Sequence, residues 1–192
     1  VHIPDRYGTM VPLHLELYDY LIANGIESDY VLMQATNQLF VRKGVFEFMQ
    51  QYDGSYFNRI VDHKCIDRLK STKVFDHYYN HIGSENFKYQ SNHDGMFFKY
   101  KIFVDMMEYY GAYRGVSTGD HAEEFLYSAF LLKNNYSMVE FSSYNYWCAN
   151  WAVPSSVVKK EEIDHCISKG YFLVKRVARD LNDPARSYIR GL

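Results

Sequence analysis

The sequence has little of several features that define common classes of protein. Its 192 residues include three cysteines and four prolines, and no apolar run approaches the roughly 20 residues that a membrane-spanning helix needs. The cysteines, Cys65, Cys148 and Cys166, are odd in number and widely spaced, which favours free thiols in a reducing compartment over a disulfide framework. A luminal protein with one disulfide is the alternative. The net charge of -2 argues against a general nucleic-acid binder.

Several common catalytic motifs are also missing. No glycine-rich phosphate loop follows an expected strand, and no Asp-x-Asp pair stands at a strand end to hold a divalent ion and a diphosphate. The eight histidines lack the tight spacing of metal ligands. His93-Asp94 leaves one metal alternative, a His-Asp phosphohydrolase, which needs further ligands on a mainly helical frame. We therefore expect no metal and no cofactor.

Aromatic residues and a basic C-terminal segment stand out. Tyrosine, phenylalanine and tryptophan make up 18% of the chain, enough for the core and for platforms that stack on sugars. From Lys169 to the C-terminus the sequence has six basic and two acidic residues, which gives this segment a local charge of +4. Such a segment suits a phosphate-bearing ligand or an anionic membrane surface, and a solvated helical face is the alternative.

The hydrophobic pattern predicts one α/β domain over residues 1–192 without linkers or repeats. We expect helices over 10–24, 44–52, 101–110, 120–133 and 161–168, one or two more within 65–82, and strands over 29–34, 87–90, 96–100, 139–147 and 171–176. Gly83-Ser84 is the expected break after the helices within 65–82. The strand count is low for a complete α/β enzyme, so we expect more chain before Val1.

Glu123 is the first candidate for chemistry. It follows a polar loop at the start of an amphipathic helix, where the helix N-terminus favours an ionised carboxylate. Such a group can act as a general base toward a hydroxyl. The alternative is structural, with Asp120 as N-cap and Glu123 completing a capping box. Glu124 projects about 100° further round the helix, so only one of the two faces a given acceptor.

The second candidate is the basic end of the expected strand over 171–176. Lys175 and Arg176 present cations at its carboxyl end, where open α/β sheets usually bind ligands. Fixed cations can stabilise the charge that builds on a departing diphosphate. Surface salt bridging is the alternative reading.

Taken together, these segments resemble the core-2/I-branching family of glycosyltransferases, which includes peptide xylosyltransferases and related bacterial and viral enzymes. The similar segments are YGTMVPLHLEL (7–17), DYVLMQATNQLF (29–40), GMFFKYKIFVDMM (95–107), AEEF (122–125), NW (150–151) and FLVKR (172–176). Their order and intervals agree with the family. The sequence departs from it at Asn37, where the family often has Asp, at Glu124, which replaces a His, and at Ala122, which replaces an acidic residue.

The resemblance implies a GT-A-like fold of a mixed sheet flanked by helices, and metal-independent transfer of a sugar with inversion. Glu123 would be the catalytic base, and Lys175 would hold the donor diphosphate with help from Arg176 and from Lys160 or Lys159. The candidates for contact with the acceptor are Trp151, Asp94, Asn37 and Glu124, together with Asn92 and Trp147; core packing is the alternative for both tryptophans. Part of the nucleotide pocket would precede Val1.

The resemblance also sets the expected partners and location. The partners are a nucleotide sugar and a glycan or other hydroxyl acceptor, with peripheral membrane contact through the basic segment and no nucleic acid. The location is cytoplasmic or peripheral to a membrane, or a Golgi-type lumen in a eukaryote. A non-catalytic carbohydrate-binding or assembly domain that keeps the aromatic surface is the main rival function.

Overall fold

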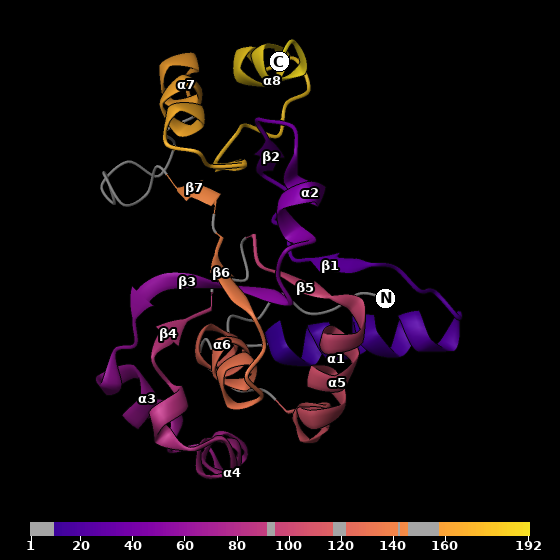
Figure 1. Ribbon diagram of the computed structural model, residues 1–192, viewed down its shortest axis with the longest axis vertical. Helices are drawn as coiled ribbons and strands as arrows, with labels where there is room; N and C mark the ends of the chain where they lie inside the picture. Colours follow the sequence, from indigo (N-terminus) through magenta and orange to yellow (C-terminus); the bar gives the residue numbers. More distant parts are fainter. Residues whose placement is uncertain (1–9, 92–94, 117–121, 142, 146–157) are drawn as a thin grey trace.

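The computed structural model describes residues 10–91, 95–116, 122–141, 143–145 and 158–192. It is a mixed α/β structure, as the sequence predicts (Figure 1). Its helices are α1 (Met10–Ala23), α2 (Val45–Met49), α3 (His63–Leu69), α4 (Lys73–Ile82), α5 (Tyr100–Tyr109), α6 (Glu123–Lys133), α7 (Lys160–Ser168) and α8 (Pro184–Arg190), with short 3-10 turns η1 (Ser84–Asn86) and η2 (Gly111–Tyr113). Its strands are β1 (Tyr30–Leu32), β2 (Gln38–Phe40), β3 (Gly54–Ile60), β4 (Tyr89–Gln90), β5 (Phe97–Lys99), β6 (Met138–Glu140), β7 (Ser143–Asn145) and β8 (Leu173–Lys175).

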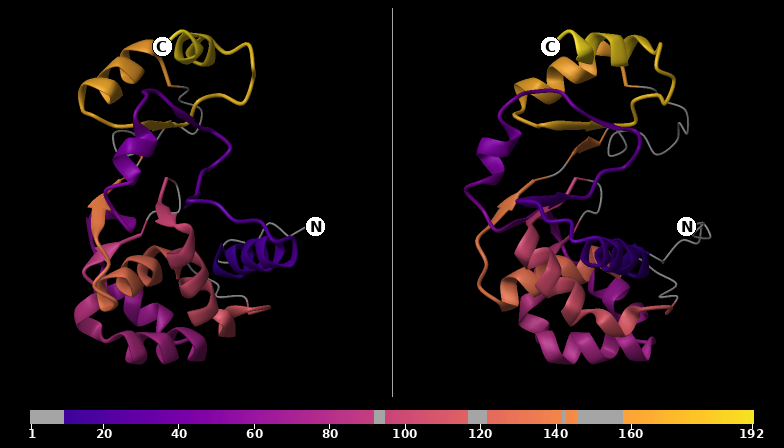
Figure 2. Two further views of the ribbon diagram at one scale, coloured as in Figure 1. Left: turned by 45° about the vertical axis from the view of Figure 1, so that its right-hand side comes forward. Right: turned by 90° about the vertical axis from the view of Figure 1, so that its right-hand side faces the viewer.

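The strands form two sheets. The larger has the order β1-β5-β3-β4, with β6 pairing parallel to β3, and the smaller has the order β2-β8-β7, with β7 parallel to β8. The remaining pairs are antiparallel. Helices α1 and α3 to α6 gather on one side of the larger sheet, whereas α7 and α8 lie at the opposite end of the molecule, beyond the smaller sheet (Figures 1 and 2).

Three groups of buried apolar residues hold these layers together. The lower core joins the larger sheet to α1 and α3–α6 and includes Phe98 and Leu126. The upper core lies between the smaller sheet and α7 and α8, and includes Val174. The middle core contains Phe97 of β5 and Leu173 of β8, so it packs one sheet against the other. Burial on this scale is the main source of folding free energy.

Local sequence explains where several elements begin and end. The Thr72 hydroxyl accepts a hydrogen bond from the Phe75 N–H at the start of α4. Gly83 ends that helix with φ of 88°, a conformation that favours glycine, and the expected break at Gly83-Ser84 is confirmed. The predicted helices occur, with α2 shorter than expected over its range. The strand predicted as one segment over 139–147 is wrong: within that range β6 and β7 are separate strands and belong to different sheets, because β6 pairs with β3 and β7 with β8. The other predicted strands occur in shorter form.

The structure adds elements that the sequence pattern did not predict: β2, β3 and α8. The most important is β3, which pairs with β4, β5 and β6 at the centre of the larger sheet. A Cβ atom at Gly54, the first residue of β3, would lie 2.9 Å from Leu131 Cδ1 and 3.2 Å from Phe98 Cδ1. The glycine therefore permits α6 to approach the sheet closely.

Candidate functional site

Glu123 is the first residue of α6, which packs on the lower core. Ala122 occupies the N-cap position, and its side chain makes no capping hydrogen bond. Asp120, which the capping box of the sequence analysis requires as N-cap, lies outside the described residues, so that structural alternative stays a prediction. The surroundings of the Glu123 carboxylate are described.

Those surroundings are buried and aromatic. The Glu123 side chain is 1% exposed, although carboxylates are rarely fully buried in proteins. Burial raises the pKa of Tyr127, and the nearby negative charge of Glu123 raises it further. Burial also raises the pKa of Tyr113, with smaller contributions from Tyr78 and Glu123. The carboxylate thus faces two neutral phenols, one a full turn along α6 and one from η2.

A histidine from α1 extends this buried polar group. The Nδ1 atom of His14 lies 2.6 Å from the Tyr127 hydroxyl, and both side chains are buried. Sequence reasoning missed His14, Tyr113 and Tyr127, because each comes from a different element and nothing in their local pattern separates them from ordinary core aromatics.

The first turn of α6 also contacts the larger sheet through the backbone. The carbonyl of Glu124 accepts a hydrogen bond of 2.5 Å from the N–H of Ser91, just after β4. Further along, Gly95 N–H donates to the carbonyl of Met33, just after β1. The start of α6 therefore lies beside the end of β4, and the residue Gly95 before β5 lies beside the end of β1.

Lys175 ends β8 in the smaller sheet. Burial and, to a smaller extent, the positive charge of Arg176 together lower its pKa from 10.5 to about 8. Burial also lowers the pKa of Arg176. A partly buried ammonium therefore lies beside a second, more exposed cation, an arrangement that favours an anion as ligand.

Asn37 and Arg176, predicted for acceptor and donor contacts, lie next to each other. The carbonyl of Asn37 accepts hydrogen bonds from the N–H groups of Arg176 (3.0 Å) and Val177 (3.1 Å). Arg176 has φ of 78°, which costs free energy for a residue with a side chain and is common at functional sites. These backbone bonds fix the direction in which the chain leaves β8.

Of the remaining predicted residues, two lysines lie on the surface at the start of α7, and the others fall outside the described residues. Lys160 is exposed at the start of α7, with its ammonium 5.0 Å from the centre of the Tyr188 ring in α8. Lys159 is exposed at the N-cap of the same helix. The expected residues Trp151, Asp94, Asn92, Trp147 and His93 lie outside the described residues.

Arginines of the basic C-terminal segment bind the backbone around α8. The Nε atom of Arg186 donates to the Ala178 carbonyl, and Nη2 of Arg190 donates to the Leu181 carbonyl. These two bonds hold the segment before α8 in place.

In the part of the chain that is described, no helix combines the length and apolar character needed to cross a bilayer. Membrane contact through this segment stays a prediction.

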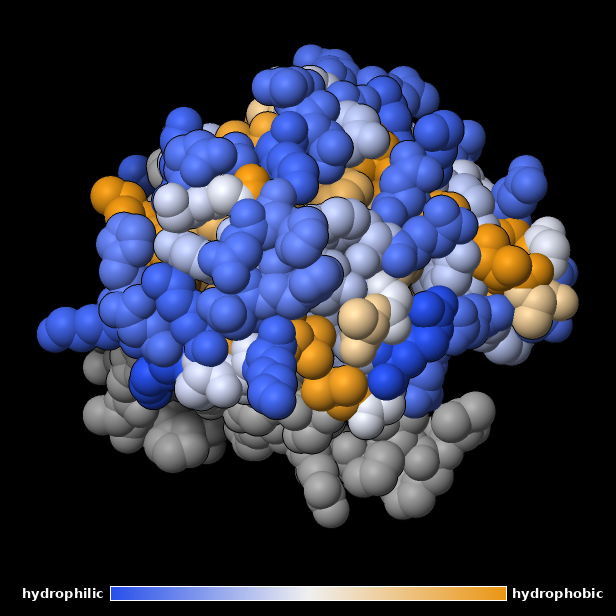
Figure 3. Space-filling model, turned by 90° about the horizontal axis from the view of Figure 1, so that it is seen from below, coloured by the Kyte–Doolittle hydropathy of each residue, from blue (hydrophilic) through white to orange (hydrophobic). Residues whose placement is uncertain are grey.

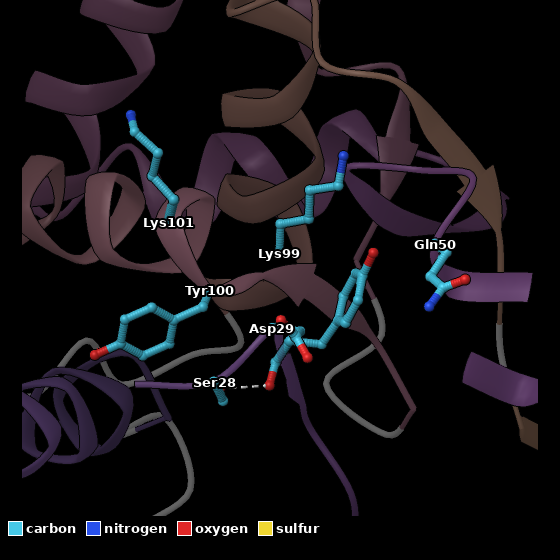
Figure 4. A pocket seen from close by; sticks show the side chains of 7 residues that line it. Ser28, Asp29, Gln50, Lys99, Tyr100 and Lys101 are labelled. Carbon is cyan, nitrogen blue, oxygen red and sulfur yellow. Dashed lines mark hydrogen bonds between the residues drawn. The ribbon is translucent and has the colours of Figure 1, made fainter. Parts of the chain in front are cut away.

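An open hollow of about 480 Å³ lies elsewhere, at the end of the β1–β5 ladder away from Met33 (Figure 4). Its two lysines already have carboxylate partners: Lys99 lies 2.8 Å from Asp53, and Lys101 lies 3.2 Å from Asp105. On the face seen in Figure 3, apolar side chains form small, separate groups among polar ones. Neither feature adds a residue to the candidate site.

The described residues contain no group of three or more His, Cys, Asp or Glu side chains arranged to hold a metal ion. Cys65 and Cys166 are free thiols, and burial raises the pKa of Cys166 to about 12.

Comparison with known proteins found no matching family model, no similar curated protein and no similar solved structure.

Proposed function

We propose that the chain is the catalytic, acceptor-side part of an inverting, metal-independent glycosyltransferase with a GT-A-like fold. The observation that carries the proposal is the burial of Glu123, 1% exposed beside the phenols of Tyr113 and Tyr127. Ionisable groups in such surroundings are concentrated at functional sites. The partly buried Lys175 beside the cation of Arg176 supports a second half of the site, one that binds phosphate.

The proposed reaction uses these groups in one displacement. Glu123 takes the proton from the acceptor hydroxyl as its oxygen attacks the anomeric carbon of the donor sugar. The bond from that carbon to the diphosphate oxygen breaks, and its electrons leave with the diphosphate. Lys175 and Arg176 stabilise the added negative charge, and attack opposite the leaving group inverts the anomeric carbon. Positioning of the two substrates supplies a large share of the rate.

The proposal makes a structural demand. A base has to come within hydrogen-bond distance of the proton that it removes, about 2.6–3.2 Å between heavy atoms. Because Glu123 is almost fully buried, the acceptor can bind productively only after a conformational change exposes the carboxylate. Glu124 and Asn37 are the described residues that we propose for contact with the acceptor.

The test is a screen of sugar nucleotides by thermal shift, with and without a chelator, because a ligand of the native state raises the melting temperature. The donor that responds is then incubated with candidate hydroxyl acceptors, and the anomeric configuration of the product is determined by NMR. We expect a response that the chelator does not change and a product of inverted configuration. Loss of the response with chelator, or a retained configuration, would contradict the proposal.

The same burial of Glu123 also fits a rival function, a carbohydrate-binding or assembly domain without donor chemistry. In that case Glu123 is only part of the aromatic core. Titration with nucleoside diphosphates separates the two: binding that Lys175→Ala weakens favours the transferase, whereas no binding favours the rival.

A further inference from the structure

Gln38 occupies an unusual position for an amide side chain. It begins β2 and lies directly opposite Lys175 of β8 in an antiparallel ladder. Its side chain is 2% exposed. Residues directly opposite each other in such a ladder project from the same face of the sheet, with Cβ atoms about 4.5–5.5 Å apart. Gln38 and Lys175 are therefore neighbours on one face.

The orientation of the Gln38 amide is fixed by its oxygen. Oε1 accepts a hydrogen bond of 2.5 Å from the Ala35 N–H. Because a backbone N–H can only donate, the oxygen must face Ala35 and the NH₂ group must point the other way. That group, Nε2, is buried and has no hydrogen-bond partner among the described residues.

A buried donor without an acceptor costs free energy, and most buried polar groups avoid this. Nearby, Lys175 and Arg176 add only donors, because neither an ammonium nor a guanidinium accepts hydrogen bonds. The group that would satisfy an amide donor beside two cations is an anionic oxygen.

The face from which Gln38 and Lys175 project is turned toward the larger sheet. Leu173 is two residues before Lys175, on the same face of β8, and belongs to the middle core between the sheets. Val174 points the opposite way, into the upper core under α7 and α8. Lys175 and Gln38 therefore project toward the larger sheet rather than toward α7 and α8.

We propose that Gln38 is a ligand-binding residue: its Nε2 group donates to a phosphoryl oxygen held by Lys175 and Arg176. The inference rests on the proposed phosphate role of those two cations and adds a neutral, directional donor to them. A cation pair attracts any anion, whereas a fixed amide selects an oxygen in one position. Because Nε2 is inaccessible in this structure, the phosphate has to displace the groups that cover it.

The test is calorimetric titration of the protein with inorganic pyrophosphate and with UDP. Gln38→Met removes the donor and adds no charge, while Gln38→Glu keeps the oxygen that accepts from Ala35 and replaces the donor by an anionic oxygen. Gln51→Glu is the matched control for net charge, since Gln51 is exposed after α2 and donates to the Glu47 carbonyl. Circular dichroism checks that each variant is folded.

We expect Gln38→Met to weaken both ligands about tenfold, the value of one hydrogen bond to a charged group. Gln38→Glu should weaken them further, and Gln51→Glu should leave affinity within about twofold. If Gln38→Met and Gln38→Glu both bind like the wild type while Lys175→Met loses binding, the role of Gln38 is refuted and the phosphate site stands. If the wild type binds neither ligand, or if Lys175→Met also binds normally, the phosphate site itself is refuted.

Discussion

Replacement of Lys175 by Met should make the protein more stable and, at the same time, unable to bind a phosphate. The lysine is held in a place that disfavours its charge, since burial and Arg176 together lower its pKa from 10.5 to about 8. At 1.36 kcal/mol per pH unit, this corresponds to a cost of about 3 kcal/mol for keeping the ammonium charged. Contact of part of the side chain with water reduces the expected cost to about 1–2 kcal/mol.

The sign of the pH dependence follows from the lowered pKa. Between about 8 and 10.5 the unfolded chain holds a proton on Lys175 that the folded chain has lost, so the stability of the wild type rises with pH in this window. The advantage of Lys175→Met over the wild type should therefore be full below pH 8 and disappear above pH 10.5.

The assay is urea unfolding at a series of pH values from 6 to 10.5, followed by circular dichroism. Lys169→Met is the control, because Lys169 is exposed after α7 and its replacement removes one positive charge without changing a buried site. At pH 7 we expect Lys175→Met to gain about 1–2 kcal/mol and the control to change by less than about 0.5 kcal/mol. A Lys175→Met variant that is less stable than the wild type at pH 7 would refute the reasoning, because it would show that the buried ammonium is stabilising.

Two further predictions concern the core. Gly54→Ala should destabilise the protein by about 1–3 kcal/mol, because its Cβ would meet Leu131 Cδ1 at 2.9 Å; an unchanged urea midpoint would show that α6 can move away. Tyr127→Phe should cost about 1–3 kcal/mol by removing the hydroxyl that bonds to buried His14. Its matched control is Tyr110→Phe, which removes another buried hydroxyl, the one that donates to the Leu126 carbonyl. Equal transfer rates for the two variants, once both are folded, would mean that the Tyr127 hydroxyl has no part in the site beyond stability.

The parts of the fold that the sequence predicted are those set by neighbours along the chain. Helix α4 begins after Thr72, whose side chain accepts a local hydrogen bond, and ends at Gly83, which has a positive φ. Both signals can be recognised from the residue type alone. By contrast, β3 has the sequence GSYFNRI, without the alternation of an ordinary strand, and its pairing with β4, β5 and β6 is decided by the tertiary structure.

The candidate site divides in the same way. Glu123, Lys175 and Arg176 were predicted because each stands at the end of an element with a clear local pattern. The aromatic surroundings of Glu123 were not, since Tyr113 comes from a separate element, η2, and His14, which bonds to Tyr127, comes from α1, more than 100 residues earlier in the sequence. Gln38 was missed for the same reason: its importance depends on the pairing of β2 with β8. Long-range pairing of this kind leaves no signal in a short window of sequence.

The most direct test of the central claim is the transfer rate of Glu123→Gln with the donor identified by the screen, measured beside Glu47→Gln, an exposed residue of α2. Glutamine keeps the size of the side chain and removes the base. We expect Glu123→Gln to lose about 10²–10⁴-fold in rate while its affinity for the nucleotide and its fold stay as in the wild type, and Glu47→Gln to transfer normally. A folded Glu123→Gln variant that transfers sugar at the wild-type rate would contradict the claim that this buried carboxylate is the base.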